Sequence, residues 1–480
     1  MIMKRNAMLV CLCLVCFCAK NEPEQQTEIT GKYQPTLESI SEHETPEWLK
    51  DAKIGIQFVG PPMGFDDEQS YHWTRAAQRV RQLGVDESDA ALRAEIDNFA
   101  VVGGIQYVWD IQAPAALDEL MQKYKRTGAK YLVSMLQAAY PGTEGLRMTA
   151  GEAEAAKRAG LKIGIHYNLL RRERSPSIGD PGYVDWYRNR VKTEVQNIDA
   201  DFLFFDGCQS SSAYFKTPEL VSWFYNWADA RGKDVWVNED LGIDCRESEE
   251  YGDVLEGEGF TQSGIASKTL INWDTMRNEW TCWVNEFGIH KRDGKKWEWM
   301  HREVDELLHV FLYNVSIGGV WCIQMVNTQQ AWDNMFEIGD WLAINGDAIY
   351  NTRPYGDPDP NAIRLPQGGK PIITGTPRSP KGGAHWLWRF KQTVAVAEQK
   401  GPIHFTRNGN TLYAIHWAWP GDEVVIPNVT PATGTVIKML GVDSALDWRQ
   451  DGEDLVIKTP DSKPCNYAYS FEIPGGAKGM

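Results

Sequence analysis

The feature that most constrains the fold is a recurring helix–strand unit. In each copy an amphipathic helix ends at a glycine, and a run of β-branched or aromatic residues begins a few residues later, as it does after Gly128, Gly160 and Gly232. Glycine closes a helix because it adopts the left-handed backbone conformation without strain. Helices that alternate with continuous apolar strands predict a parallel sheet that is buried on both faces.

The number of these units favours a closed barrel over an open sheet. Strands are expected near residues 53–58, 130–136, 161–167, 201–205, 234–238, 252–256 and 319–325. Seven or eight units within about 300 residues are typical of a (β/α)8-like barrel, which we place at residues 46–353. No glycine-rich dinucleotide fingerprint follows the first strand, which weakens the alternative of an open nucleotide-binding sheet.

The pattern changes after the barrel. Residues 354–384 are rich in proline and glycine and are expected to form a linker. From residue 385 to 480 the apolar period is two, and Asn408-Gly409-Asn410 separates two apolar runs as in a hairpin. This region predicts a C-terminal antiparallel β-sandwich.

The N-terminus has the features of an export signal. Lys4 and Arg5 precede an apolar run from Ala7 to Phe17 that is too short to span a bilayer. A polar, acidic stretch follows Cys18, so residues 1–18 resemble a bacterial lipoprotein signal and residues 19–45 are expected to be a polar linker. Cys18 is the expected lipid anchor on a periplasmic or outer-surface protein, and ordinary cleavage with secretion is the alternative.

Charge and tryptophan content narrow the function. The net charge is −16, which argues against nucleic acid as a partner because phosphate binding needs a basic surface. The chain has 20 tryptophans, whose flat faces stack on sugar rings or fill a large core. Composition alone leaves both uses of tryptophan open.

Acidic residues follow several of the expected strands. Asp206 ends the apolar strand that begins at Phe202, Glu239 follows Asn238 at the next strand, and Glu256 and Glu258 end another. In a β/α barrel the carboxyl ends of the strands carry the active site. Several carboxylates at that end, with abundant tryptophan, indicate glycoside hydrolysis, in which one carboxylate attacks the sugar and another protonates the leaving oxygen.

At these residues the sequence resembles glycoside hydrolase family 29, the α-L-fucosidases. The segments that carry the resemblance are 45–56, 128–133, 159–168, 204–207, 252–258 and 338–350. The resemblance implies a barrel and sandwich fold, with Asp206 as the nucleophile and Glu258 as the acid/base. Glu256 is the second choice for the acid/base.

The departures from the family pattern lie among the residues that grip the sugar. The first strand ends at Phe58 where the family has a histidine, the paired histidines of the family are Ala138 and Ala139, and the family's arginine after Asn238 is absent. A site built to bind hydroxyls loses affinity when its donors are missing. The catalytic centre therefore resembles the family, while the sugar pocket is expected to differ.

We therefore expect a retaining glycosidase that cleaves α-L-fucosyl or related sugars, including sulfated or otherwise substituted ones, from oligo- or polysaccharides. The expected pocket walls all lie at or near strand ends: Gln137, Tyr140, His166, Tyr167, Asn238, Glu239 and Trp321. Neither a metal nor an organic cofactor is expected.

Two other interpretations remain open at this stage. The loss of hydroxyl-gripping residues suits a catalytically inactive glycan-binding protein on a hydrolase scaffold. Trp417 and Trp419 lie on one face of a C-terminal strand, where they either bind glycan or pack against the barrel. A pocket that faces both acids supports an enzyme, whereas a pocket filled by side chains supports a scaffold.

Overall fold

The structure is a computed structural model of the full chain. It describes residues 31–58, 114–136, 150–168, 181–206, 215–238, 254–258, 269–275, 303–316, 318–325, 329–355 and 402–477. Within these residues no helix is both long and apolar enough to cross a membrane.

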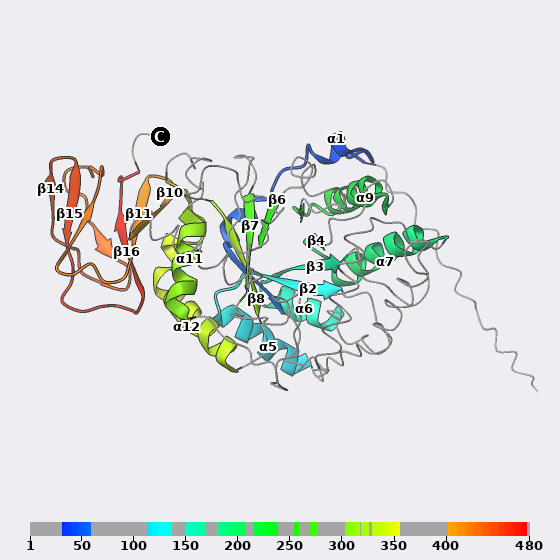
Figure 1. The fold of residues 1–480 in the computed structure, drawn as a ribbon, viewed down its shortest axis with the longest axis horizontal. Coiled ribbons are helices and arrows are strands. Elements are labelled where there is room, and N and C mark those ends of the chain that lie inside the picture. The colour runs from blue at the N-terminus through cyan, green and yellow to red at the C-terminus, as the bar shows by residue number, and fades with distance from the viewer. Residues whose placement is uncertain are drawn as a thin grey trace, which may run out of the picture.

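The first part of the chain forms an eight-stranded sheet, and every ladder between its described strands is parallel. Its strands are β1 (Ile54–Phe58), β2 (Tyr131–Leu136), β3 (Lys162–Asn168), β4 (Phe202–Asp206), β5 (Trp236–Val237), β6 (Val254–Glu258), β7 (Thr269–Thr275) and β8 (Val320–Met325). The order β5-β4-β3-β2-β1-β8-β7-β6 is that of a β/α barrel, with β1 and β8 joined. The curled sheet lies at the centre of Figure 1. The expected barrel fold is confirmed.

Among the described residues no ladder joins β5 to β6, and residues 239–253 between them lie outside the described part of the chain. One barrel strand was missing from the sequence prediction. This strand, β7, contains Asn272 and Asp274, which interrupt the apolar run that identifies a buried strand.

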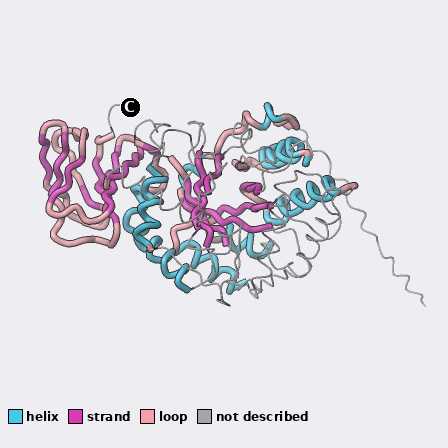
Figure 2. Tube along the Cα trace, viewed as in Figure 1, coloured by secondary structure: helices cyan, strands magenta, loops and turns pink. Residues whose placement is uncertain are grey.

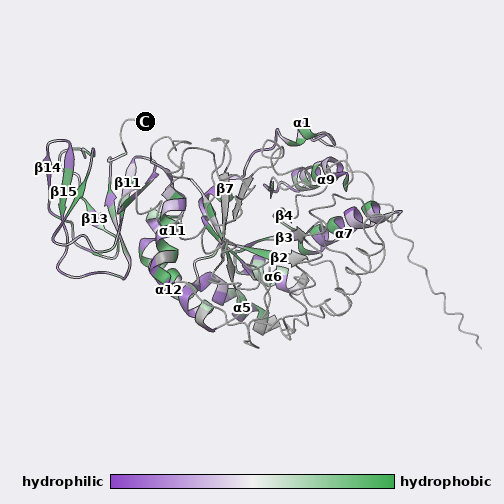
Figure 3. Ribbon diagram, viewed as in Figure 1, coloured by the Kyte–Doolittle hydropathy of each residue, from purple (hydrophilic) through white to green (hydrophobic). Residues whose placement is uncertain are grey.

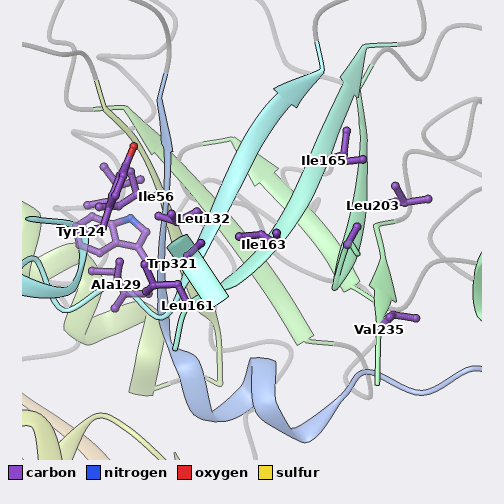
Figure 4. Packing of buried hydrophobic residues seen from close by; sticks show 14 of the residues in the cluster. Ile56, Tyr124, Ala129, Leu132, Leu161, Ile163, Ile165, Leu203, Val235 and Trp321 are labelled. Atoms are coloured by element: carbon purple, nitrogen blue, oxygen red, sulfur yellow. The ribbon is translucent and has the colours of Figure 1, made fainter. Parts of the chain in front are cut away.

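Helices cover the outside of the sheet (Figures 1 and 2). They are α5 (Pro114–Arg126), α6 (Ala150–Arg158), α7 (Tyr183–Ile198), α9 (Thr217–Asp229), α11 (Val304–Ser316) and α12 (Gln329–Asn345), which a short 3-10 turn η3 (Gly346–Ala348) follows. Figure 3 shows that α5, α7, α11 and α12 carry both hydrophobic and hydrophilic residues, as expected of helices with one face on a sheet. Their apolar residues share one core with the outward strand residues (Figure 4).

The segment before β1 packs on the barrel and shortens the expected linker. It contains α1 (Leu37–Ile40) and α2 (Glu47–Ala52). Tyr33 and Ile40 are buried, and the ring of His43 stacks on Tyr225 of α9 at 3.8 Å. Residues 31–45 are therefore an ordered arm, although their polar composition predicts a linker, because their partners lie in a helix far along the chain.

The C-terminal part consists of two antiparallel sheets, as predicted. One has the order β13-β16-β11-β10-β9 and the other the order β12-β15-β14. The strands are β9 (Arg353–Pro354), β10 (Ile403–Asn408), β11 (Thr411–Trp417), β12 (Glu423–Ile426), β13 (Lys438–Met439), β14 (Trp448–Asp451), β15 (Asp454–Lys458) and β16 (Ala468–Ile473). Their inward residues form a separate apolar core. Because β9 pairs with β10, the five-stranded sheet includes Arg353, which comes before the predicted linker.

The two parts share a buried junction. The indole nitrogen of Trp341 on α12 donates to the Ala468 carbonyl oxygen at 2.8 Å. The ring of Trp417 stacks on His309 of α11 at a centroid distance of 3.8 Å. Trp417 therefore packs against the barrel, whereas Trp419, beyond the end of β11, packs edge-on against Tyr469 of the C-terminal core.

Candidate active site

The alternation of side chains separates the two faces of each barrel strand. Phe202 and Phe204 of β4 belong to a cluster with rings and aliphatic groups of other strands, whereas Leu203 and Phe205 belong to the core shared with the helices. The first pair therefore faces the barrel interior and the second faces outward. Since alternate residues share a face, position 206 falls on the interior face at the carboxyl end of β4.

The interior face of the neighbouring strands brings polar residues beside this position. Asn168, the last residue of β3, is the register partner of Asp206, and His166 is the partner of Phe204. The His166 side chain is only 6% exposed, and its ring lies 5.2 Å from that of Phe204. His166 therefore lies on the interior face, two residues before Asn168, the register partner of Asp206.

Asn238 lies just beyond β5 and is fully buried. The backbone N–H of Phe205 donates to Asn238 Oδ1 at 2.7 Å, and Asn238 Nδ2 donates to the Phe205 carbonyl oxygen at 2.7 Å. These two bonds hold the peptide groups on both sides of Phe205, directly before Asp206. The prediction of Asn238 as a pocket residue therefore acquires a specific geometry, a contact with the β4 backbone.

The two candidate acids of β6 both occupy interior positions. Glu256 pairs in register with Ile271 of β7, and Glu258 with Trp273. Those two β7 residues pair with Val320 and Cys322 of β8, which belong to the interior cluster. Positions 256 and 258 thus face the same interior as position 206, and Glu258 is the last residue of its strand.

Several predicted site residues lie outside the described part. Gln137, Tyr140 and Glu239 are not described at all, and the side chains of Asp206, Glu256, Glu258 and Tyr167 are not described beyond their backbone. The roles of Asp206 and Glu258 therefore rest on strand position and face.

Two predicted wall residues belong to the outward face. Trp321 is fully buried, lies in the core shared with the helices, and stacks on Phe311 of α11 at 5.0 Å. Position 167 is the register partner of the outward Phe205. The physical reasons differ: Trp321 is the second residue of β8 and so lies at the amino end of its strand, whereas position 167 is near a carboxyl end but has the outward parity.

Two interior positions were missed from the sequence, Gln57 of β1 and Asn168 of β3. The Gln57 side chain is fully buried, and its register partners are Val133 and Gln324. Counting in steps of two from the apolar interior residues of each strand identifies both positions. Among the described side chains no group of three or more His, Cys, Asp or Glu residues is arranged to hold a metal ion.

Comparison with known proteins points in one direction. Residues 398–474 match the family model for the alpha-L-fucosidase C-terminal domain. Tissue alpha-L-fucosidase of Homo sapiens is 21% identical to this chain over 97% of the chain and 96% of the human protein. The Mus musculus protein is 22% identical over 90% of the chain and 92% of its own length.

Solved structures give the same result for the fold. Thermotoga maritima alpha-fucosidase superposes with a TM-score of 0.59 at 17% identity, covering 92% of this chain and all of that one. A family 29 alpha-L-fucosidase from Bacteroides thetaiotaomicron gives a TM-score of 0.54 at 12% identity, with 94% and 97% coverage. The resemblance to glycoside hydrolase family 29, with substantial divergence, is confirmed.

Proposed function

We propose that this divergent member of glycoside hydrolase family 29 is a retaining glycosidase that cleaves α-L-fucosyl or related sugars from oligo- or polysaccharides. The observation that carries the proposal is the arrangement of position 206. It lies on the interior face at the carboxyl end of β4, with Asn168 beside it. The two hydrogen bonds between Asn238 and the Phe205 backbone, which we call the Asn238 clamp, lie directly before it. The interior acidic positions of β6 lie at the same end of the sheet.

In the proposed mechanism Asp206 attacks the anomeric carbon and forms a covalent glycosyl–enzyme intermediate. Glu258 protonates the leaving glycosidic oxygen and then takes a proton from the water that releases the sugar. A retaining mechanism requires the two carboxyl groups to lie about 5–5.5 Å apart, which leaves no room for water between nucleophile and sugar. Glu256, two residues earlier on the same face, is the reserve for the acid/base role.

The proposed sugar is α-L-fucose or a substituted or stereochemically related sugar, because the residues that bind the hydroxyls differ from the family pattern. Where that pattern has histidines, this chain has Phe58, Ala138 and Ala139, and where it has an arginine this chain has Asp240. Alanine in place of histidine removes a hydrogen bond to a hydroxyl but makes room for a bulkier group. A fucosyl residue with a neutral substituent, or a stereochemical relative, fits this change best, and sulfated sugars are included in the screen as the case that the acidic replacement disfavours.

The proposal is tested by screening nitrophenyl glycosides and fucosylated or sulfated polysaccharides with the wild type and Asp206→Asn. We expect hydrolysis with retained anomeric configuration, lowered by more than about 1,000-fold in the variant because the nucleophile is removed. An equally active Asp206→Asn protein would show that the nucleophile is another residue. Tight glycan binding without hydrolysis would favour the scaffold interpretation instead.

The choice between the two β6 acids has its own test. A glycoside whose leaving group is already a weak base needs no protonation, so loss of the acid slows ordinary substrates far more than activated ones. We expect Glu258→Gln to show this split by a factor of about 100, and Glu256→Gln to slow both substrates alike. The reverse pattern would move the role to Glu256.

We also propose that the protein is exported and held at the membrane through Cys18. The basic start, short apolar run and polar stretch after Cys18 support this. Mass spectrometry of the mature N-terminus should find a lipid-modified cysteine. An unmodified terminus would indicate cleavage and release.

A further inference from the structure

The ladder between β4 and β5 ends before β4 does. Its register pairs are Phe202 with Trp236 and Leu203 with Val237, and β5 is only two residues long. Strand β4 continues to Asp206. On the side of β4 that faces β5, the Phe205 backbone therefore lies beyond the last residue pair of the β4–β5 ladder.

Beside Phe205, the side chain of Asn238 takes the place that a longer β5 would occupy. A carboxamide offers one N–H donor and one oxygen acceptor, the same pair of groups that a peptide of a neighbouring strand would present. Both of its bonds to Phe205 are 2.7 Å long, and the side chain is fully buried. Buried from water, such bonds are costly to break, so this clamp fixes the backbone that leads into Asp206.

A second asparagine makes the same pair of bonds elsewhere. The Tyr33 N–H donates to Asn226 Oδ1 at 2.9 Å, and Asn226 Nδ2 donates to the Tyr33 carbonyl oxygen at 2.8 Å. Asn226 is also buried, at 5% exposure. It lies near the end of α9 that leads into the amino end of β5, away from the carboxyl ends of the strands. The chain thus contains a matched clamp with no link to the candidate site.

We propose that Asn238 is a positioning residue for Asp206, acting through the Phe205 backbone. This inference rests on the proposed glycosidase function. A nucleophile displaced by about 1 Å from its line of attack loses on the order of 100-fold in rate, because the reacting atoms no longer meet at the required distance. The role assigned to Asn238 is therefore to set the turnover rate rather than to grip the sugar.

The test compares Asn238→Ala and Asn238→Asp with Asn226→Ala and Asn226→Asp. We expect Asn238→Ala to lower kcat by about 100-fold with KM within about 3-fold, since ground-state sugar contacts remain. Asn226→Ala should lower the melting temperature by about as much as Asn238→Ala does, but it should change kcat by less than about 2-fold. The aspartate variants keep the shape and one acceptor, so they test the clamp where an alanine variant fails to fold.

Three results would overturn the proposal. One is a fall in kcat that is equal at the two asparagines for equal losses of melting temperature. Another is a rise in KM without a fall in kcat, which would make Asn238 a sugar contact. The third needs no variant: fast hydrogen exchange of the Phe205 amide in the wild type would show that the clamp is absent.

Failure of the proposed function is distinguishable from failure of this inference. A wild-type protein that cleaves none of the screened glycosides overturns the glycosidase function, and with it the catalytic consequence of the clamp. Slow exchange of the Phe205 amide in that same protein would still establish the clamp as a structural feature.

Discussion

The two ends of the barrel interior differ in chemistry along the same strands. At the amino end the ring of Phe202 stacks on Trp236 at 4.4 Å and meets Tyr131 edge-on at 5.8 Å. Two residues further along, the interior positions mix the polar His166 and Asn238 with Phe204 and Val133, and after two more residues β4 reaches Asp206. The difference separates two tasks: a rigid aromatic layer supports the strands, and the opposite end is free to carry reactive groups.

Two glycines make the aromatic layer fit. A Cβ atom at Gly164 would lie 2.2 Å from the ring of Phe202, and one at Gly55 would lie 2.2 Å from the ring of Tyr131. Each glycine is the register partner of the aromatic residue that it accommodates. Glycine within a strand thus marks the place where a neighbouring ring crosses the backbone.

The largest expected effect tests the supporting end. Trp236→Ala should destabilise the protein by about 3–5 kcal/mol, because it removes a fully buried indole that stacks on Phe202. Urea unfolding of this variant beside Asp206→Asn measures the contrast. If the division is real, Asp206→Asn loses activity at nearly unchanged stability. A comparable loss of stability in Asp206→Asn would break the comparison.

The next largest effect concerns buried polar groups outside the barrel interior, whose protonation is coupled to the stability of the fold. His309 and His404 are buried at the junction with the C-terminal sheets, with ring centroids 5.2 Å apart. Burial lowers the pKa of His309 to about 4, and burial with neighbouring histidines lowers the pKa of His404 to about 3. Both rings are therefore neutral in the folded protein where an unfolded chain would protonate them.

The sign follows from that difference in pKa. The contribution of the two neutral rings to the free energy of unfolding is fully present above the unfolded pKa of about 6.5. It is lost as pH falls from about 6.5 toward 4, at about 1.4 kcal/mol per pH unit for each ring. Urea midpoints between pH 7 and 4 should show a shallower fall for His404→Gln than for the wild type. An unchanged slope in His404→Gln would show that its ring is hydrated.

A smaller effect tests the fit of glycine to ring. Gly164→Ala should cost about 1–3 kcal/mol, since the new methyl group overlaps a ring that is itself held by Trp236. In the double variant Gly164→Ala/Phe202→Leu the overlap is relieved, so the two costs should sum to more than the measured loss. Strict additivity would mean that the strand moves instead.

The smallest effect isolates one hydroxyl of the aromatic layer. Tyr131→Phe removes the bond from the Tyr131 hydroxyl to the Trp321 carbonyl oxygen, 3.0 Å long, and should cost about 1 kcal/mol. Its kcat should stay at the wild-type value, because Tyr131 belongs to the supporting end. A fall in kcat as large as that of Asn238→Ala would show that the two ends are coupled.

Much of the fold could be predicted because periodicity is a local property. The apolar stripe of α11 and the runs of β2 to β4 each identify their element without reference to the rest of the chain. The arm at residues 31–45 could not be predicted in this way. Its burial depends on Asn226 and Tyr225, nearly two hundred positions later, and nothing in a polar stretch announces such a partner.

The candidate site was predicted in part for a related reason. Strand ends could be located, and His166 and Asn238 are both buried. Trp321 and Tyr167 lie at strand ends too, but on the outward face. Residue type suggests function, whereas facing depends on parity counted from an anchored interior residue. The Asn238 clamp depends in addition on where β5 stops, which the sequence does not reveal.

The aromatic layer has a consequence for traffic through the molecule. The rings of Trp48, Tyr131, Phe202 and Trp236 fill the amino end of the barrel among the described strands, so a ligand reaches the interior of these strands from the carboxyl end. Whatever enters between the carboxyl ends must depart by the route it came.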